Sequence, residues 1–110
     1  MRAWKTFWFE ASHTLPDNPQ THGHSYQVKL WFETNPVQPV ELNQIEKLLW
    51  QLHRYVDHRH LNDFIKNPTM EGISEAIFNQ GQVIIKNQEI RLNLLAVDVE
   101  RPSLNFGVQA

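Results

Sequence analysis

Hydrophobic and polar residues alternate along two stretches near the N-terminus. The first stretch covers residues 2–12, and its apolar residues Phe7, Phe9 and Ala11 occupy alternate positions. In the second, residues 24–34, apolar side chains occupy every other position: Tyr26, Val28, Leu30 and Phe32. Because successive side chains of a strand point to opposite faces, both stretches are predicted to be strands with one apolar face.

The period of the pattern changes after the proline-containing residues 35–39. From Glu41 onward, apolar residues recur every three or four positions, which is typical of an amphipathic helix: Leu42, Ile45, Leu48, Leu49 and Leu52. This helix is expected to end near Tyr55. A second helix is predicted to begin after Thr69, a favourable N-cap residue, and to end near Gly81.

The last third of the chain returns to a strand pattern. Residues 83–90 fit either the start of a strand or a continued helix. Residues 92–100 alternate clearly, and residues 104–108 are expected to pair back onto them after the turn at Pro102. We therefore predict one α+β domain over residues 1–110, in the order ββααββ, with a four-stranded antiparallel sheet and two helices on one of its faces.

The composition excludes several classes of protein. The formal net charge is −2 at pH 7 and no basic tract is present, so we expect no nucleic-acid binding. No apolar stretch approaches about 18 residues, and the N-terminus lacks a signal-peptide pattern, so we expect no membrane segment and a cytoplasmic protein. The absence of cysteine excludes disulfides, thiolate metal ligands and a cysteine nucleophile.

Three histidines lie close together between the first two predicted strands. His22 and His24 are two residues apart, so on a strand both imidazoles leave the same face. His13 ends the first apolar stretch, and a loop containing Pro16 and Pro19 would bring it beside the other two. Zinc binds neutral imidazole nitrogen, and three protein ligands leave a fourth position for water or substrate. The spacing favours a metal site over the alternative, three surface histidines that flank a loop.

Four other polar residues are candidates for a functional site. Asp57 and His58 follow the first predicted helix, which indicates either a functional loop or a helix end with a solvated histidine. Glu71 falls in the first turn of the second helix, where the helix dipole alone stabilises a carboxylate. Glu100, near the end of the last long strand, is either a binding group or an edge-strand charge. The residues alone leave these alternatives open.

Five short motifs, in one order along the chain, resemble the 6-pyruvoyltetrahydropterin synthase and 6-carboxytetrahydropterin synthase family. A single His-Gly-His is weak evidence, whereas the ordered set is specific and covers nearly the whole chain. The motifs are Phe9–His13, His22–Tyr26, Asp57–Asn62, Pro68–Glu71 and Val99–Glu100. The resemblance implies the tunnelling fold, in which sheets from several subunits close into a barrel. It also implies a homohexamer (a dimer of trimers) with active sites between subunits.

The resemblance further implies an activity, that of the queuosine-pathway branch of the family. Enzymes of this branch are zinc-dependent lyases that convert 7,8-dihydroneopterin triphosphate to 6-carboxy-5,6,7,8-tetrahydropterin, with release of acetaldehyde and triphosphate. A close relative eliminates triphosphate to give 6-pyruvoyltetrahydropterin. The implied cofactor is therefore Zn2+, and the implied partner is a pterin triphosphate substrate.

Matching the motifs residue by residue implies a role for each candidate. Asp57 and His58 match an acid-oriented histidine that transfers protons. Glu100 matches the carboxylate that accepts hydrogen bonds from the pterin ring, and Glu71 lies in the motif that assists at the pterin end. The implied zinc ligands are three histidines: His13, His22 and His24.

The chain departs from the family at the catalytic cysteine, because Asn18 occupies that position. The neighbouring Asp17 stands close to the same place. Three hypotheses follow: a lyase, a non-catalytic pterin-binding or zinc-binding paralogue that has lost the thiol, and a pterin aldolase-type variant. In the last, Asp17 or another acid would replace the thiol. The candidate catalytic residues are His58, Asp57 and Asp17.

Overall fold

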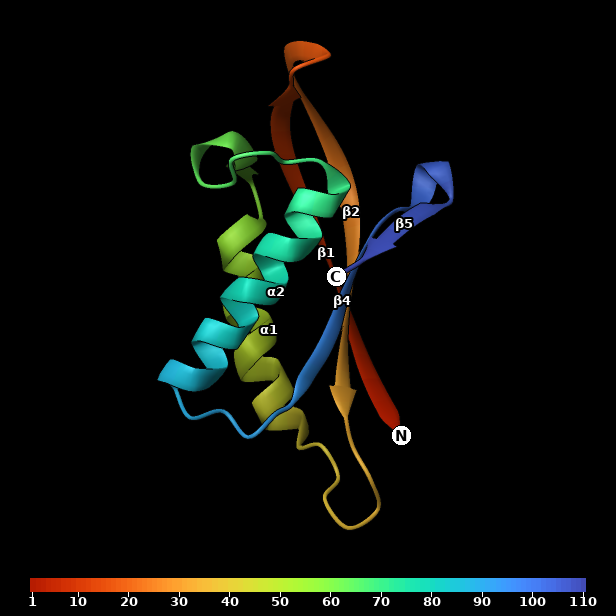
Figure 1. Ribbon diagram of the computed structural model, residues 1–110, viewed down its shortest axis with the longest axis vertical. Coiled ribbons are helices and arrows are strands. Elements are labelled where there is room, and N and C mark those ends of the chain that lie inside the picture. The colour runs from red at the N-terminus through yellow and green to blue at the C-terminus, as the bar shows by residue number, and fades with distance from the viewer.

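The computed structural model describes residues 1–110, and its longest feature is a two-stranded hairpin (Figure 1). Strand β1 spans Arg2–Leu15 and strand β2 spans Asn18–Glu33, so only Pro16 and Asp17 form the turn between them. The two strands pair antiparallel, with an irregularity only near the turn. Both predicted strands are confirmed, and each extends further toward the turn than the sequence pattern indicated.

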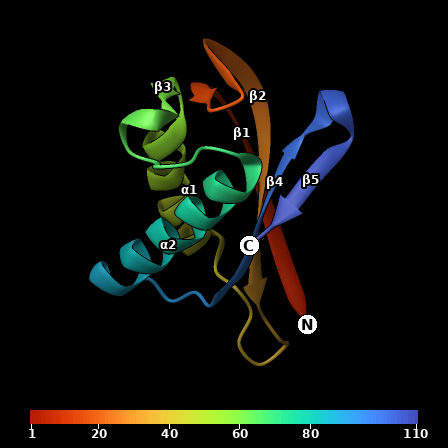
Figure 2. The ribbon, with the colours of Figure 1, turned by 45° about the horizontal axis from the view of Figure 1, so that its top comes forward.

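Two helices, α1 (Leu42–Val56) and α2 (Met70–Asn87), cover one face of the sheet (Figures 1 and 2). The first helix matches its prediction. The predicted end of the second near Gly81 is wrong, because this glycine lies inside α2, where a Cβ would come 2.8 Å from Leu94 Cδ2. The glycine therefore permits close packing, and residues 83–87 continue the helix. Neither helix is long and apolar enough to cross a membrane.

The sheet has five strands in the order β3-β1-β2-β4-β5. Strands β4 (Leu94–Arg101) and β5 (Phe106–Gln109) pair antiparallel, but β3 (Arg59–His60) pairs in parallel with β1. The predicted four-stranded antiparallel sheet of order ββααββ is therefore wrong, since the sheet is mixed and has a fifth strand. A strand of two residues has no alternation that the sequence could reveal. Short 3-10 turns at Leu61–Asp63 and Pro102–Leu104 complete the chain.

The core lies between the sheet and the two helices. Phe9 of β1 stacks on Tyr26 of β2, with 4.8 Å between their ring centroids. The apolar parity of β2 and the inward faces of the helices are fully or almost fully buried: Val28, Leu30, Phe32, Ile45, Leu48, Leu52, Ile73 and Ile77. Burying one such side chain contributes roughly 1.5–3 kcal/mol, so the set fixes which face of each strand points inward.

The opposite face of the sheet carries exposed aromatic side chains. Trp4 and Trp8 on β1 are 56% and 51% exposed. The Lys29 ammonium lies 4.9 Å from the centre of the Trp4 ring. Large exposed apolar side chains that gather on a sheet face are typical of a surface covered by another molecule.

We predict that Gly72→Ala destabilises the protein by about 1–3 kcal/mol, because its Cβ would clash with the backbone oxygen of Asn67. That oxygen moves only if the loop before α2 moves with it. Urea denaturation measures the change in the free energy of unfolding. Gly81→Ala is the matched control: its Cβ meets the flexible end of Leu94, and we expect a smaller loss. Equal losses in the two variants would contradict this packing.

Candidate metal centre

Three imidazoles converge near the turn of the β1–β2 hairpin. His13 pairs directly with His22, and His24 lies opposite Ala11. All three belong to the strand parity that faces the core. The ring centroid of His13 lies 4.5 Å from that of His22 and 5.1 Å from that of His24, and the last two are 4.9 Å apart. One nitrogen from each ring lies within 4.8 Å of the others. The hairpin therefore brings the three predicted ligands together.

Backbone carbonyls fix the protonation of two of these rings. His13 Nδ1 lies 2.7 Å from the carbonyl oxygen of Pro68, and His22 Nδ1 lies 2.8 Å from that of Gln20. A carbonyl only accepts, so each Nδ1 carries the proton and donates, which leaves each Nε2 with a lone pair. The Nε2 of His13 is buried and has no hydrogen-bond partner.

The surroundings favour the neutral form of two of these imidazoles, those of His13 and His24. Burial is the largest cause that lowers the pKa of His24, to about 4, and the positive charges of Arg101, His13 and His22 lower it further. Burial also lowers the pKa of His13, and the hydrogen bond to Pro68 opposes this only in part. Metal ligation requires the neutral imidazole.

This donor set fits a zinc ion. Zinc accepts three imidazole nitrogens in a tetrahedral site that keeps one position open. A histidine ligand usually donates its other N–H to a carbonyl or carboxylate, as His13 and His22 do here. A metal on the Nε2 atoms would also satisfy the buried nitrogen of His13.

A second group of polar residues lies where α1 ends, against the edge of β1 that pairs with β3. The His58 backbone N–H donates to the Glu10 carbonyl, and the Glu10 N–H donates to Asp57 Oδ1. Asp57 Oδ2 accepts from His58 Nδ1 at 2.7 Å and lies 3.5 Å from His53 Nε2. His58 adopts a positive φ of 55°, which turns the chain from the helix into β3. The carboxylate therefore orients the imidazole.

The hydrogen bonds of Asp57 keep it ionised. Burial raises the pKa of this carboxyl, but the hydrogen bonds from the Glu10 N–H and from His58, with the nearby His53 charge, hold the pKa below its usual value. Because His58 Nδ1 donates to Asp57, its Nε2 is the nitrogen that can accept a proton. The His58 side chain is 79% exposed, so this nitrogen is accessible to a ligand.

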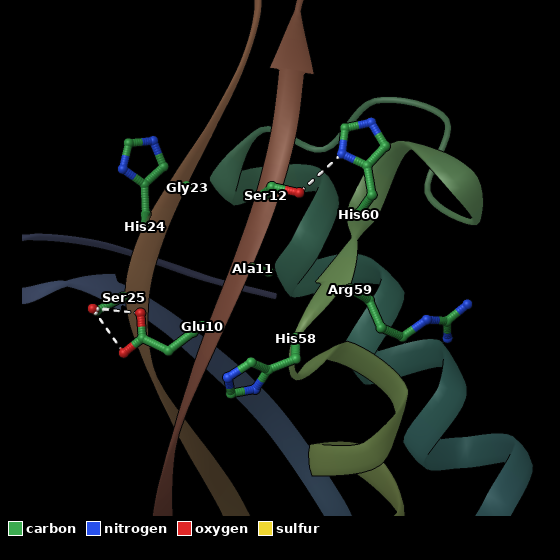
Figure 3. A pocket seen from close by; sticks show the side chains of 9 residues that line it. All are labelled: Glu10, Ala11, Ser12, Gly23, His24, Ser25, His58, Arg59 and His60. Atoms are coloured by element: carbon green, nitrogen blue, oxygen red, sulfur yellow. Dashed lines mark hydrogen bonds between the residues drawn. The ribbon is translucent and has the colours of Figure 1, made fainter.

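His58 borders an open cavity of about 490 Å³ (Figure 3). Ser25 Oγ lies 2.9 and 2.7 Å from the two carboxylate oxygens of Glu10, and Ser12 Oγ lies 3.0 Å from His60 Nδ1. The lining is mostly polar: Glu10, Ala11, Ser12, Gly23, His24, Ser25, His58, Arg59 and His60. The sequence prediction included His58 and His24 but missed Glu10, whose only signal was a charge on the polar parity of an aromatic strand.

The cavity and the three imidazoles lie on opposite faces of the hairpin. Glu10 and Ser25 pair with each other and have the strand parity opposite to that of His13 and His24. His24 lines the cavity, but its ring points away from His58 (Figure 3). Within one chain, the oriented acid–base pair and the candidate metal ligands therefore face different sides of the sheet.

Asp17 lies apart from both groups. It is an exposed residue of the two-residue turn, four positions beyond His13, which is roughly 13 Å along an extended strand. His58 lies at the level of Glu10, further still from the turn. Asn18, at the position of the family cysteine, pairs with Leu15 across the hairpin.

The two predicted substrate-binding carboxylates also lie apart from each other. Glu100 lies on β4, where it pairs with Gln27 of β2 on one side and with Gly107 of β5 on the other. Its side chain is half-buried and packs over Gly107. It borders a shallow cavity of about 360 Å³ on the sheet face away from the helices. Glu71 is exposed in the first turn of α2. Neither carboxylate belongs to the group of ligand atoms that could hold a metal ion.

Comparisons with known proteins identify relatives over almost the whole chain. The family model for 6-pyruvoyl tetrahydropterin synthase matches residues 2–106. The 6-pyruvoyl tetrahydropterin synthase of Caenorhabditis elegans superposes with a TM-score of 0.78 at 20% identity, covering 100% of this chain and 95% of that one. An uncharacterized protein of Wolinella succinogenes gives 0.74 at 13% identity, covering 100% and 97%.

The third similar structure is the 6-pyruvoyl tetrahydropterin synthase of Plasmodium vivax, with a TM-score of 0.60 at 15% identity, covering 100% of this chain and 98% of that one. It has also been solved with a catalytic glutamate replaced by alanine or by cysteine. At these identities the structural similarity establishes a common fold.

We predict that protein purified without chelators holds about one zinc ion per chain, since three imidazoles converge and one position stays open. His22→Ala removes a ligand and is expected to abolish most of the bound metal. His53→Ala is the control, because His53 contacts Asp57 and Phe7 rather than the trio. Metal analysis by mass spectrometry gives the stoichiometry, and equal zinc contents in the two variants would remove the metal assignment.

Proposed function

This chain belongs to the 6-pyruvoyl tetrahydropterin synthase family, and we propose that it is a zinc-dependent lyase that acts on 7,8-dihydroneopterin triphosphate. The observation that carries the proposal is the buried, unpartnered Nε2 of His13 among three convergent imidazoles. Within the family we propose the queuosine-pathway reaction in the cytoplasm. Its products are 6-carboxy-5,6,7,8-tetrahydropterin, acetaldehyde and triphosphate.

The residues of the chain would divide the work of this reaction. Zinc bound by the trio would supply Lewis-acid chemistry at the side-chain hydroxyls of the substrate. His58, oriented by Asp57, would accept and return protons through its Nε2. Glu100 would accept hydrogen bonds from the amino and ring N–H groups of the pterin, which a carboxylate matches as a bidentate acceptor.

The missing thiol needs a substitute, and Glu10 is the carboxylate that best fits this role. It shares a cavity with His58, and Ser25 holds both of its oxygens. Asp17, the alternative from the sequence, lies in the exposed turn. The glutamate described as catalytic in the Plasmodium vivax enzyme supports a carboxylate in such a role. We propose that Glu10 accepts the proton that a cysteine removes elsewhere in the family.

The separation of the two residue groups supports a shared site in an oligomer. The trio and the His58 cavity face opposite sides of one hairpin, so a substrate that touches both needs two chains. The exposed Trp4 and Trp8 offer apolar surface for subunit contact. We propose a homohexamer, a dimer of trimers, in which the cavity of one subunit meets the imidazoles of another.

A non-catalytic pterin-binding or zinc-binding protein is the second candidate function. Asn18 favours it, because an amide cannot act as the base that the family cysteine supplies. Such a protein would keep zinc and bind pterin without converting it. An aldolase-type variant would instead cleave a carbon–carbon bond of a dihydropterin lacking the triphosphate. Mass analysis of products from both substrates distinguishes the three functions.

We predict that zinc-loaded protein converts 7,8-dihydroneopterin triphosphate and that His58→Ala abolishes turnover, because the oriented imidazole is lost. Glu10→Gln is expected to lower kcat by about 10²-fold or more, the usual effect of losing a positioned proton acceptor. Asp17→Asn is the matched carboxyl control and should retain activity. Products are measured by mass spectrometry. Full activity in Glu10→Gln with loss in Asp17→Asn would assign the base to the turn instead.

We predict that Glu100→Gln weakens the binding of a pterin analogue by about 1.5–3 kcal/mol while zinc content stays the same, since the amide retains only one good acceptor. Asp98→Asn is the control, because Asp98 lies in the same cavity but accepts from Trp31 and Gln109 within the chain. Calorimetric titration gives both affinities. A pterin that binds Glu100→Gln as tightly as the parent would exclude this carboxylate.

We predict that His22→Ala and His58→Ala, each inactive alone, complement each other in mixed oligomers. If one site uses the trio of one chain and the His58 of another, random assortment restores about a quarter of the parent activity. The mixture is prepared by co-expression with two tags and assayed beside each single variant. Light scattering that gives a 13.0 kDa monomer, or a mixture no more active than its parts, would contradict the shared site.

A further inference from the structure

Arg101, the last residue of β4, lies on the helix-covered face of the sheet. Strand β4 pairs with β2 up to Gln27↔Glu100, so Arg101 comes opposite Tyr26. Opposed residues of antiparallel strands point to the same face. Tyr26 packs edge-on against His24, with 5.9 Å between the ring centroids. The Arg101 side chain therefore shares its face of the sheet with the three imidazoles.

The guanidinium of Arg101 has no acceptor within the chain. Its Nε is buried without a hydrogen bond, and Arg101 takes part in none of the ion pairs. The hydroxyl of Tyr26 is likewise buried and unpartnered. Arg101 is half-buried, and Nε is the atom of its guanidinium that is shielded from water. A buried N–H is normally paired with an acceptor, because leaving it unpaired costs free energy. Two unpaired donors on one side of the metal centre indicate an acceptor that is not part of this chain.

The positive charge of Arg101 lies close enough to His13, His24 and Tyr26 to act on all three residues. A divalent cation on the imidazoles would add positive charge beside the guanidinium. The combination favours an anion over a neutral ligand at this point.

We propose that Arg101 forms an anion subsite beside the metal centre and binds a phosphate oxygen of the ligand. The planar guanidinium presents paired N–H donors that match a phosphate, and the Tyr26 hydroxyl offers one more donor. The identity of the anion rests on the proposed function, since 7,8-dihydroneopterin triphosphate carries a triphosphate on its side chain. Arg101 thereby selects the phosphorylated substrate over the unphosphorylated dihydropterin.

The test titrates inorganic triphosphate into the protein by calorimetry. Triphosphate chelates zinc, so it is titrated into metal-free protein. Zinc-loaded protein is titrated with inorganic phosphate instead, and its zinc content is measured after the titration. Arg101→Gln is expected to weaken triphosphate binding about tenfold or more, the effect of one lost charge-assisted hydrogen bond. Arg101→Lys keeps the positive charge but lacks the paired N–H donors of the guanidinium, so its triphosphate affinity should lie between those of the parent and Arg101→Gln. Arg91→Gln, a surface arginine paired with Glu41, should bind as the parent does.

Each outcome decides the proposal. Unchanged triphosphate affinity in Arg101→Gln, or equal losses in Arg91→Gln, overturns the subsite. If Arg101→Gln does not fold, Arg101→Lys is used instead, and its folding is checked by circular dichroism. A folded Arg101→Lys variant that binds triphosphate as tightly as the parent also overturns the subsite, because the paired guanidinium donors then contribute nothing to binding. Dissociation of the oligomer in light scattering, with unchanged affinity, would assign Arg101 to a carboxylate of another subunit. Triphosphate binding that depends on Arg101 without any turnover would keep the subsite and remove the lyase.

Discussion

The register of the β1–β2 hairpin is the constraint on which the candidate metal centre depends. The parity that buries Phe9 and Tyr26 is the parity that carries His13 and His24, so one set of pairings fixes both the core and the imidazoles. A slip of one residue would turn every one of these side chains to the other face. Each large side chain contributes roughly 1.5–3 kcal/mol by its burial, so the core holds the register without any help from a metal.

The loop before α2 completes the site by fixing one ring. Thr69 caps the helix through its side chain, which accepts from the Gly72 N–H at 3.1 Å. The same loop places the Pro68 carbonyl against Nδ1 of His13, and Nε2 of His13 is then left buried without a partner. Such a nitrogen is destabilising until something accepts its lone pair. Metal binding and folding are therefore expected to reinforce each other.

The sequence was sufficient where a periodic pattern or a short spacing carried the signal. Alternation gave the long strands, and the two-residue spacing of His22 and His24 with the preceding His13 led to the convergent trio. The pattern failed for β3, because two residues have no period, and for the end of α2, because Gly81 serves packing against Leu94.

Residues that work through tertiary contacts had no such signal. In the sequence, Glu10 is only a single charge among the polar positions of a strand. Its place beside Asp57 and His58 depends on the turn at these two residues, which docks on β1. Arg101 follows the strand that ends in Glu100, and its relation to His24 depends on the pairing of β4 with β2. The opposite orientations of the trio and the His58 cavity likewise emerge only from the strand register.

The central claim is that the hairpin holds zinc through three imidazoles and leaves one position open. X-ray absorption at the zinc edge of the zinc-loaded protein measures this directly. The account predicts three imidazole nitrogens at about 2.0–2.1 Å and one further light-atom ligand, in a tetrahedral shell. A shell of six oxygens, or fewer than three imidazoles around the metal, would contradict it.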